Sequence, residues 1–226
     1  TVAALVRGVC AGLAARGYII GGFDACVTSD VLKGSGLSSS AAFEVLVGAI
    51  LNGLYNEGTA DAMAVAQIGQ YAENVYFGKP CGLMDQTASS LGGFVTIDFR
   101  DAAQPVVQRV AFDFAGSGHA LVILDTGGDH ADLTPDYAAV RGEMQAVAAA
   151  LGGRVLRDVS EEQVLENIPV LRAQAGDRAI LRAFHFFEDD RRVVMQAAAL
   201  EAGRFDRFLS LVIESGRSSW MLLQNC

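Results

Sequence analysis

The sequence has little positive charge for its length and no long apolar run. Its 226 residues include 17 lysines and arginines against 26 aspartates and glutamates, a formal net charge of −9, so the chain as a whole repels nucleic-acid phosphates and anionic lipid. Arg16 ends the first apolar stretch and Asp125 interrupts a later one before either reaches the ~20 residues that a membrane helix needs. We therefore expect no nucleic-acid partner and no membrane span.

A paired-cysteine motif is also missing. The four cysteines lie far apart in the sequence, without C-x-x-C spacing, at Cys10, Cys26, Cys81 and Cys226. A chain with 51% hydrophobic residues can build a core without disulfides, and this content excludes a disordered chain. We expect reduced thiols and a cytoplasmic protein.

Both ends of the chain fall beside helical patterns. The sequence starts at Thr1 without methionine, within an amphipathic pattern, and stops at Cys226 directly after another. We expect this chain to be an internal part of a longer protein.

The N-terminal part of the sequence predicts a helix, a strand, a glycine-rich loop and two further helices. Apolar residues recur at helical spacing over Val2–Ala15, and glycines then break the pattern. The alternating, β-friendly segment 23–29 predicts a strand that runs into the loop. Helical spacing returns over Ser38–Leu54, and Thr59 is a candidate N-cap for a helix that continues through Glu73.

The rest of the sequence predicts a small antiparallel sheet followed by helices. Runs rich in β-forming residues, separated by turn residues, cover Phe94–Phe99, Val106–Phe114 and His119–Thr126. Helical patterns then cover Pro135–Leu151, Glu161–Ile168, Asp177–Ala202 and Phe205–Gln224. The composition changes near residue 93, which predicts an α+β chain of two domains, with helices and the glycine loop in 1–92 and a small antiparallel sheet covered by helices in 93–226.

The strongest local motif is a run of glycines and serines, Gly34-Ser35-Gly36-Leu37-Ser38-Ser39-Ser40-Ala41-Ala42. Glycines let the backbone approach a ligand closely, and the unpaired N–H groups of a following helix attract phosphate. The simpler alternative is a serine-rich helix cap. The Walker pattern G-x-x-x-x-G-K-[ST] is absent, and Ser39 stands where a dinucleotide loop has its third glycine, so another phosphate-binding class is required.

Four motifs in order resemble the galactokinases of the GHMP small-molecule kinase superfamily. They are the glycine–serine run, AEN at 72–74, CGLMDQ at 81–86 and DTGGDHADLTPDYAAV at 125–140. The loop alone indicates the superfamily, whereas MDQ and Tyr137 are more specific to galactokinases. The resemblance spans nearly the whole chain and implies a partial ATP-phosphate-binding domain over 1–92 and a partial C-terminal domain over 93–226. Leu32 replaces a family proline, and the family's N-terminal and C-terminal motifs are missing.

The resemblance also implies a reaction and a set of site residues. Galactokinases transfer the γ-phosphoryl group of MgATP to the anomeric hydroxyl of galactose. The residues matching the family's phosphate-binding loop are Gly34, Ser35, Gly36, Leu37, Ser38, Ser39, Ser40 and Ala41. Ser40 and Glu73 match the Mg²⁺ ligands, which suits a metal that prefers oxygen ligands and keeps several waters. Asp85 matches the residue that accepts the proton of the sugar hydroxyl or orients it, and Tyr137 and Gly92 match sugar contacts.

Local sequence leaves simpler alternatives open. Glu73 also suits an ordinary solvated helix carboxylate, Asp85 a helix N-cap, and Tyr137 a half-buried helix tyrosine. At the level of function, the alternatives are a kinase-like sensor that binds ATP and galactose and signals to a protein partner, and a kinase for an amino sugar or another small alcohol. Because family motifs are missing, we expect the isolated chain to show little or no turnover.

Overall fold

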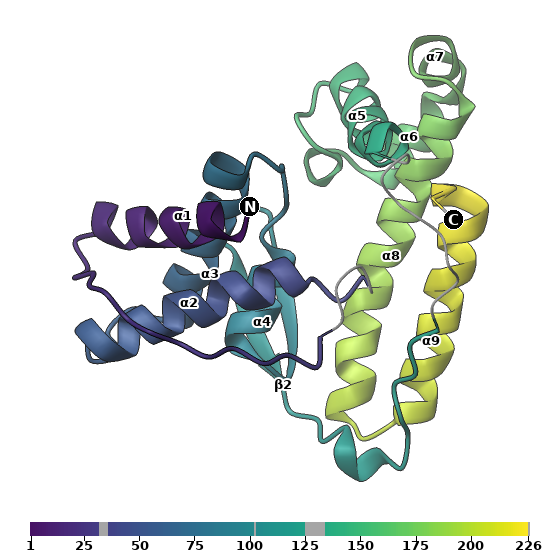
Figure 1. Ribbon diagram of the computed structural model, residues 1–226. Coiled ribbons are helices and arrows are strands. Elements are labelled where there is room, and N and C mark those ends of the chain that lie inside the picture. The colour runs from purple at the N-terminus through teal and green to yellow at the C-terminus, as the bar shows by residue number, and fades with distance from the viewer. Residues whose placement is uncertain (32–35, 102, 125–133, 226) are drawn as a thin grey trace. The chain divides into compact units, whose positions relative to one another are not determined.

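The computed structural model describes residues 1–31, 36–101, 103–124 and 134–225, with the backbone alone at 134–138. The chain divides into two compact units (Figure 1). The first comprises Thr1–Ile97 with Val107–Arg109, and the second comprises Asp98–Val106 with Val110–Cys226. Within the described residues, no helix is both long enough and apolar enough to cross a membrane.

The first unit is a group of helices built around one apolar cluster. Its helical elements are α1 (Val2–Ala15), α2 (Ser39–Tyr55), α3 (Ala62–Tyr71), a π-helical turn (Ala72–Phe77) and α4 (Met84–Leu91). The buried side chains of Val9 and Leu13 from α1 pack with those of Val47 and Leu51 from α2 and Ile68 from α3. The four-residue spacing within α1 and α2 places each pair on one helix face, as the sequence predicts.

Helix α1 approaches the π-helical turn closely. A Cβ atom at Gly8 would lie 2.6 Å from the Cα atom of Ala72, a distance that real Cβ atoms do not tolerate. Glycine at this position therefore lets the two backbones pack together and brings the turn that carries Glu73 into the core.

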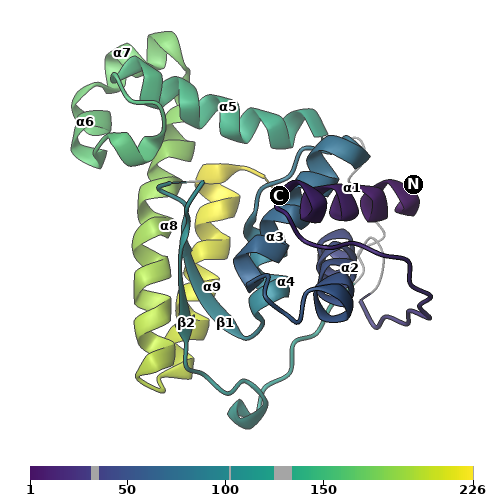
Figure 2. The ribbon, with the colours of Figure 1, turned by 90° about the vertical axis from the view of Figure 1, so that its left-hand side faces the viewer.

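A two-stranded sheet follows α4 (Figure 2). Its strands are β1 (Phe94–Asp98) and β2 (Val106–Val110). Segment 99–105 joins them and is shorter than the dozen residues that a parallel crossover requires, so the strands form an antiparallel hairpin.

The second unit is a helical assembly with a separate core. Its α-helices are α5 (Thr134–Ala150), α6 (Glu161–Glu166), α7 (Ile168–Gln174), α8 (Asp177–Glu201) and α9 (Phe205–Ser218). Short helical turns occupy Ala115–Ser117, Leu156–Asp158 and Ser219–Leu223. Helices α8 and α9 lie side by side in Figures 1 and 2 and contact each other along their length. Val147, Leu171 and Ile180 belong to the buried apolar cluster that joins α5, α7 and α8.

Two predicted strands are wrong over the residues that the structure describes. Segment 23–29 forms no strand, and neither does 119–124; β2 also ends at Val110 instead of Phe114. The side chains of Leu121 and Leu124 are 77% and 83% exposed. A strand requires a paired neighbour and a packed face, so β-forming residues alone do not produce one.

Several predicted helix boundaries also differ. Asp61, and not Thr59, caps α3, because its Oδ1 atom accepts a 2.7 Å hydrogen bond from the Ala64 N–H. Helix α3 ends at Tyr71, so Glu73 lies in the π-helical turn. The helix predicted over 161–168 ends at Glu166 as α6, and the sequence patterns do not predict α7, which begins at Ile168 with Pro169 in its first turn, where the missing N–H of proline is tolerated.

Candidate active site at the N-terminus of α2

The N-terminus of α2 offers backbone N–H groups that the side chain of its N-cap residue does not cap. Ser38 occupies the N-cap position in a left-handed conformation, with φ 54° and ψ 49°, and its hydroxyl makes no capping hydrogen bond. The first N–H groups of an α-helix have no acceptor within the helix and attract anions. Gly36 also has a positive φ of 75°, which glycine adopts freely. Gly34 and Ser35 lie outside the described residues.

The Ser38 hydroxyl bonds to Asp85 instead of capping the helix. Ser38 Oγ donates to Asp85 Oδ2 across 2.5 Å. Asp85 lies in the first turn of α4, whose N-cap is Leu83, so the alternative that Asp85 is the N-cap is wrong. The structure thus places an exposed carboxylate beside the N-terminus of α2.

Ser40 and Glu73 also meet. Ser40 Oγ donates to Glu73 Oε1 across 3.0 Å. Glu73 is only 2% exposed, so the alternative of a solvated helix carboxylate is wrong. A hydroxyl and a carboxylate oxygen at this separation form a pair of hard oxygen donors beside the first turn of α2.

Gln86 joins Glu73 to a second buried carboxyl group, that of Glu44. Its Nε2 atom donates to Glu73 Oε2 at 3.0 Å and to Glu44 Oε2 at 3.1 Å. Burial raises the pKa of Glu44 from 4.5 to about 7, with the hydrogen bond from Gln86 opposing and the charge of Glu73 adding to the rise. Gly69 allows this approach, since a Cβ there would lie 3.2 Å from Glu44 Cβ and 3.3 Å from Gln86 Cγ.

The loop that leads into α4 is fixed by Asn74 of the AEN motif. Asn74 Oδ1 accepts a 2.7 Å hydrogen bond from the Cys81 N–H, and its Nδ2 donates to the Cys81 carbonyl at 3.4 Å. Burial is the main reason that the pKa of the Cys81 thiol rises to about 12, so the thiol stays neutral. The AEN and CGLMDQ motifs therefore meet in space and hold the start of α4.

The sequence patterns assign no role to Glu44, Lys79 or Gln86, which complete this cluster. Lys79 Nζ lies 3.3 Å from Glu73 Oε1. A signal for Glu44 exists in the sequence: Ser40, Glu44, Val47 and Leu51 repeat at helical spacing, so Glu44 shares the face of the buried apolar residues.

The donor set suits Mg²⁺ better than it suits a metal whose ligands all come from the protein. Across the described ranges, no three His, Cys, Asp or Glu side chains gather in a way that would hold a metal ion. Magnesium is usually held by one or two protein oxygens together with phosphates and water, and Ser40 with Glu73 supplies such oxygens.

The two predicted sugar contacts stay predictions. Tyr137 lies on α5 in the second unit, and its side chain is outside the described part of the chain. Gly92 terminates α4 with φ 64°, and a Cβ there would meet no atom within 4 Å.

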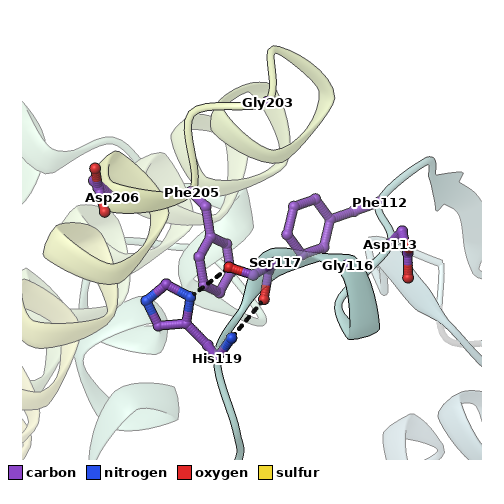
Figure 3. Close-up of a pocket in the computed structure, with 8 residues that line it drawn as sticks. All are labelled: Phe112, Asp113, Gly116, Ser117, His119, Gly203, Phe205 and Asp206. Carbon is purple, nitrogen blue, oxygen red and sulfur yellow. Dashed lines mark hydrogen bonds between the residues drawn. The ribbon is translucent and has the colours of Figure 1, made fainter.

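A separate open pocket of about 420 Å³ lies in the second unit (Figure 3). Phe112 and Phe205 stack with their ring centroids 5.0 Å apart, and His119 lies against the edge of Phe205. His119 Nδ1 is 2.9 Å from the Ser117 carbonyl oxygen. None of the site residues predicted from the sequence lines this pocket.

Comparison with known proteins identifies the first unit. Residues 4–93 match the model of the GHMP kinases N terminal domain. The chain is 35% identical over 215 residues to a galactokinase of Streptomyces coelicolor and 37% identical over 202 residues to one of Glaesserella parasuis, covering 94% and 87% of this chain. It spans only 54% and 50% of those relatives.

The fold agrees with the sequence comparison. A crystal structure of Lactococcus lactis galactokinase complexed with galactose matches with a TM-score of 0.73 and 24% identity, covering 97% of this chain and 56% of that one. The α+β fold predicted from the motifs is confirmed, with a smaller sheet than expected.

Proposed function

The chain belongs to the GHMP kinases, and we propose that it is part of a galactokinase, which transfers the γ-phosphoryl group of MgATP to the anomeric hydroxyl of galactose. The observation that carries the proposal is the hydrogen bond between Ser38 and Asp85, because it joins a phosphate-binding helix terminus to a carboxylate. Phosphoryl transfer needs the acceptor hydroxyl and the phosphate tail held in line. The helix terminus proposed to bind the phosphate tail and the carboxylate proposed to hold the hydroxyl are adjacent.

Each group at the site has a proposed role. The backbone N–H groups of Ser39, Ser40 and Ala41 bind the phosphate tail of ATP, together with the loop that precedes them. Ser40 Oγ and Glu73 hold Mg²⁺, which neutralises the charge that develops on the phosphates. Gln86 orients the Glu73 carboxylate by holding its other oxygen.

Asp85 acts on the sugar. The Ser38 hydroxyl engages one carboxylate oxygen, and a carboxylate accepts hydrogen bonds at both of its oxygens. The second oxygen accepts the hydrogen bond of the anomeric hydroxyl, orients it towards the γ-phosphate and takes its proton. Tyr137 and Gly92 contact the sugar in this proposal.

The two units correspond, in this proposal, to the ATP-phosphate-binding domain and to part of the C-terminal domain of the kinase.

The free thiols of Cys10, Cys26 and Cys81 support a cytoplasmic location.

The test is a phosphorylation assay of the full-length protein with MgATP and a panel of galactose, glucose, galactosamine and N-acetylgalactosamine. We expect galactose to be the preferred acceptor and phosphorus NMR to place the phosphate on the anomeric oxygen. Binding of ATP and galactose without turnover would favour the sensor. A preference for an amino sugar would favour the kinase with that acceptor.

A further inference from the structure

The two oxygens of the Glu73 carboxylate have different partners. Oε2 accepts a hydrogen bond from the buried amide of Gln86. Oε1 accepts one from Ser40 Oγ at 3.0 Å and lies 3.3 Å from the ammonium of Lys79. Since Oε2 is bonded inside the cluster, Oε1 is the oxygen available to a metal ion from the Ser40 side. The ammonium of Lys79 already forms an ion pair with this oxygen.

The backbone directs Lys79 onto Glu73. Gly78 ends the π-helical turn with φ 80°, a left-handed conformation that reverses the chain. The N–H groups of Gly78 and Lys79 then both donate to the Glu73 carbonyl, the second at 3.1 Å. The backbone of Lys79 is thus held beside Glu73. Its side chain is 63% exposed, which leaves room for other rotamers.

We propose that Lys79 is a tethered cation that occupies the Mg²⁺ side of Glu73 in the metal-free protein and moves to the nucleotide phosphates when Mg²⁺ binds. This inference rests on the proposed function, because it takes Ser40 and Glu73 as the magnesium ligands. Magnesium would bind Oε1 at about 2.0–2.1 Å, and two cations on one oxygen repel each other, so the arriving metal displaces the ammonium that lies 3.3 Å from this oxygen.

Two opposite effects follow from this exchange. Before the nucleotide binds, Lys79 competes with the metal for Oε1 and weakens metal binding. After the nucleotide binds, the released ammonium has a triphosphate as its partner and strengthens binding of the metal–nucleotide complex. Solvent screens the exposed ammonium of Lys79 although Glu73 is buried, so we expect each effect to be about two- to fivefold.

The experiment compares Lys79→Met with the wild type in the full-length protein. Binding of Mn²⁺ alone is measured by electron paramagnetic resonance, and binding of Mg²⁺ with a non-hydrolysable ATP analogue by calorimetry. Lys79→Met should bind Mn²⁺ more tightly and the Mg²⁺–nucleotide complex more weakly, and added salt should reduce both differences. Lys79→Arg keeps the charge, so both of its affinities should stay close to those of the wild type.

Controls separate this inference from the proposed function. Arg16→Met removes another exposed cation of the first unit, whose guanidinium bonds to Gln67 at 2.9 Å, and should change neither affinity. Glu73→Gln should weaken Mn²⁺ binding; an unchanged affinity would overturn the proposed metal site. If Glu73→Gln behaves as expected while Lys79→Met leaves both affinities unchanged, or moves them in the same direction, the role of Lys79 is wrong. Lys79→Gln repeats the test if thermal unfolding shows that the Met variant is destabilised.

Discussion

Ser38 and Asp85 are 47 positions apart in the sequence, yet the Ser38 hydroxyl donates a 2.5 Å hydrogen bond to Asp85 Oδ2. Ser38 precedes the first turn of α2, and Asp85 lies in the first turn of α4. In the proposed function, the contact therefore links the helix terminus assigned to the phosphate tail to the carboxylate assigned to the sugar.

Removing the Ser38 hydroxyl should lower turnover without unfolding the protein. Ser38→Gly keeps the backbone conformation at φ 54°, which glycine adopts without strain, and deletes the hydrogen bond to Asp85. A hydrogen bond to a charged group contributes about 1.5–3 kcal/mol, so we expect kcat to fall at least about tenfold. Steady-state kinetics of the full-length protein measures the change.

The control for this variant is Ser90→Ala. Ser90 also belongs to α4, and its hydroxyl donates to the Ala62 carbonyl at 2.8 Å. We expect this variant to lose about 1 kcal/mol of stability and to keep its kcat. Equal losses of kcat in the two variants would mean that the Ser38–Asp85 contact has no particular role.

Replacing Glu44 by glutamine should remove a pH dependence of stability. The pKa of Glu44 is about 7 in the folded protein and 4.5 without burial, so between these values the folded state binds more protons than the unfolded state. Stability therefore falls as pH rises from about 4.5 to about 7, by up to about 3 kcal/mol.

Glutamine carries no charge to desolvate, and its side-chain oxygen can still accept the hydrogen bond that Gln86 Nε2 donates to Glu44 Oε2. Chemical denaturation at pH 5 and pH 8 should show a smaller difference for Glu44→Gln than for the wild type. The account of Glu44 fails if the two proteins lose stability equally over this interval.

Two glycine-to-alanine substitutions should have opposite effects on stability. Gly8→Ala places a Cβ 2.6 Å from the Ala72 Cα, so α1 must move away from the π-helical turn, at a cost of about 1–3 kcal/mol. Gly53 lies in α2, and a Cβ atom added there would meet no atom within 4 Å, so Gly53→Ala should stabilise the protein by about 0.5–1 kcal/mol. Thermal unfolding of both variants checks the sign of each change.

Local patterns in the sequence predict much of this structure. The apolar spacing in Val2–Ala15 gives α1 with the predicted bounds, because Val9 and Leu13 find a core to pack into. The pairing of Ser40 with Glu73 follows from the family motifs. By contrast, segment 119–124 has the β-forming composition of a strand but no paired neighbour in the described chain, and composition does not reveal pairing.

The inner part of the site depends on tertiary contacts that the sequence does not show directly. Gln86 follows Asp85 in the MDQ motif, but its bonds to Glu44 and Glu73 arise only when α2, α4 and the π-helical turn pack together. Lys79 reaches Glu73 because Gly78 reverses the chain, and helical spacing does not distinguish the π-helical turn that precedes Gly78 from a continuing α-helix. Polar residues on mainly apolar helix faces are the available signal for such contacts.

The most direct test of the account is the effect of Asp85→Asn on phosphoryl transfer in the full-length protein. Asparagine keeps the size of the side chain but removes the charge and the ability to accept a proton. We expect turnover with MgATP and galactose to fall by about 10²–10⁴-fold while the affinity for an ATP analogue stays close to that of the wild type. Turnover close to the wild-type rate would contradict the account.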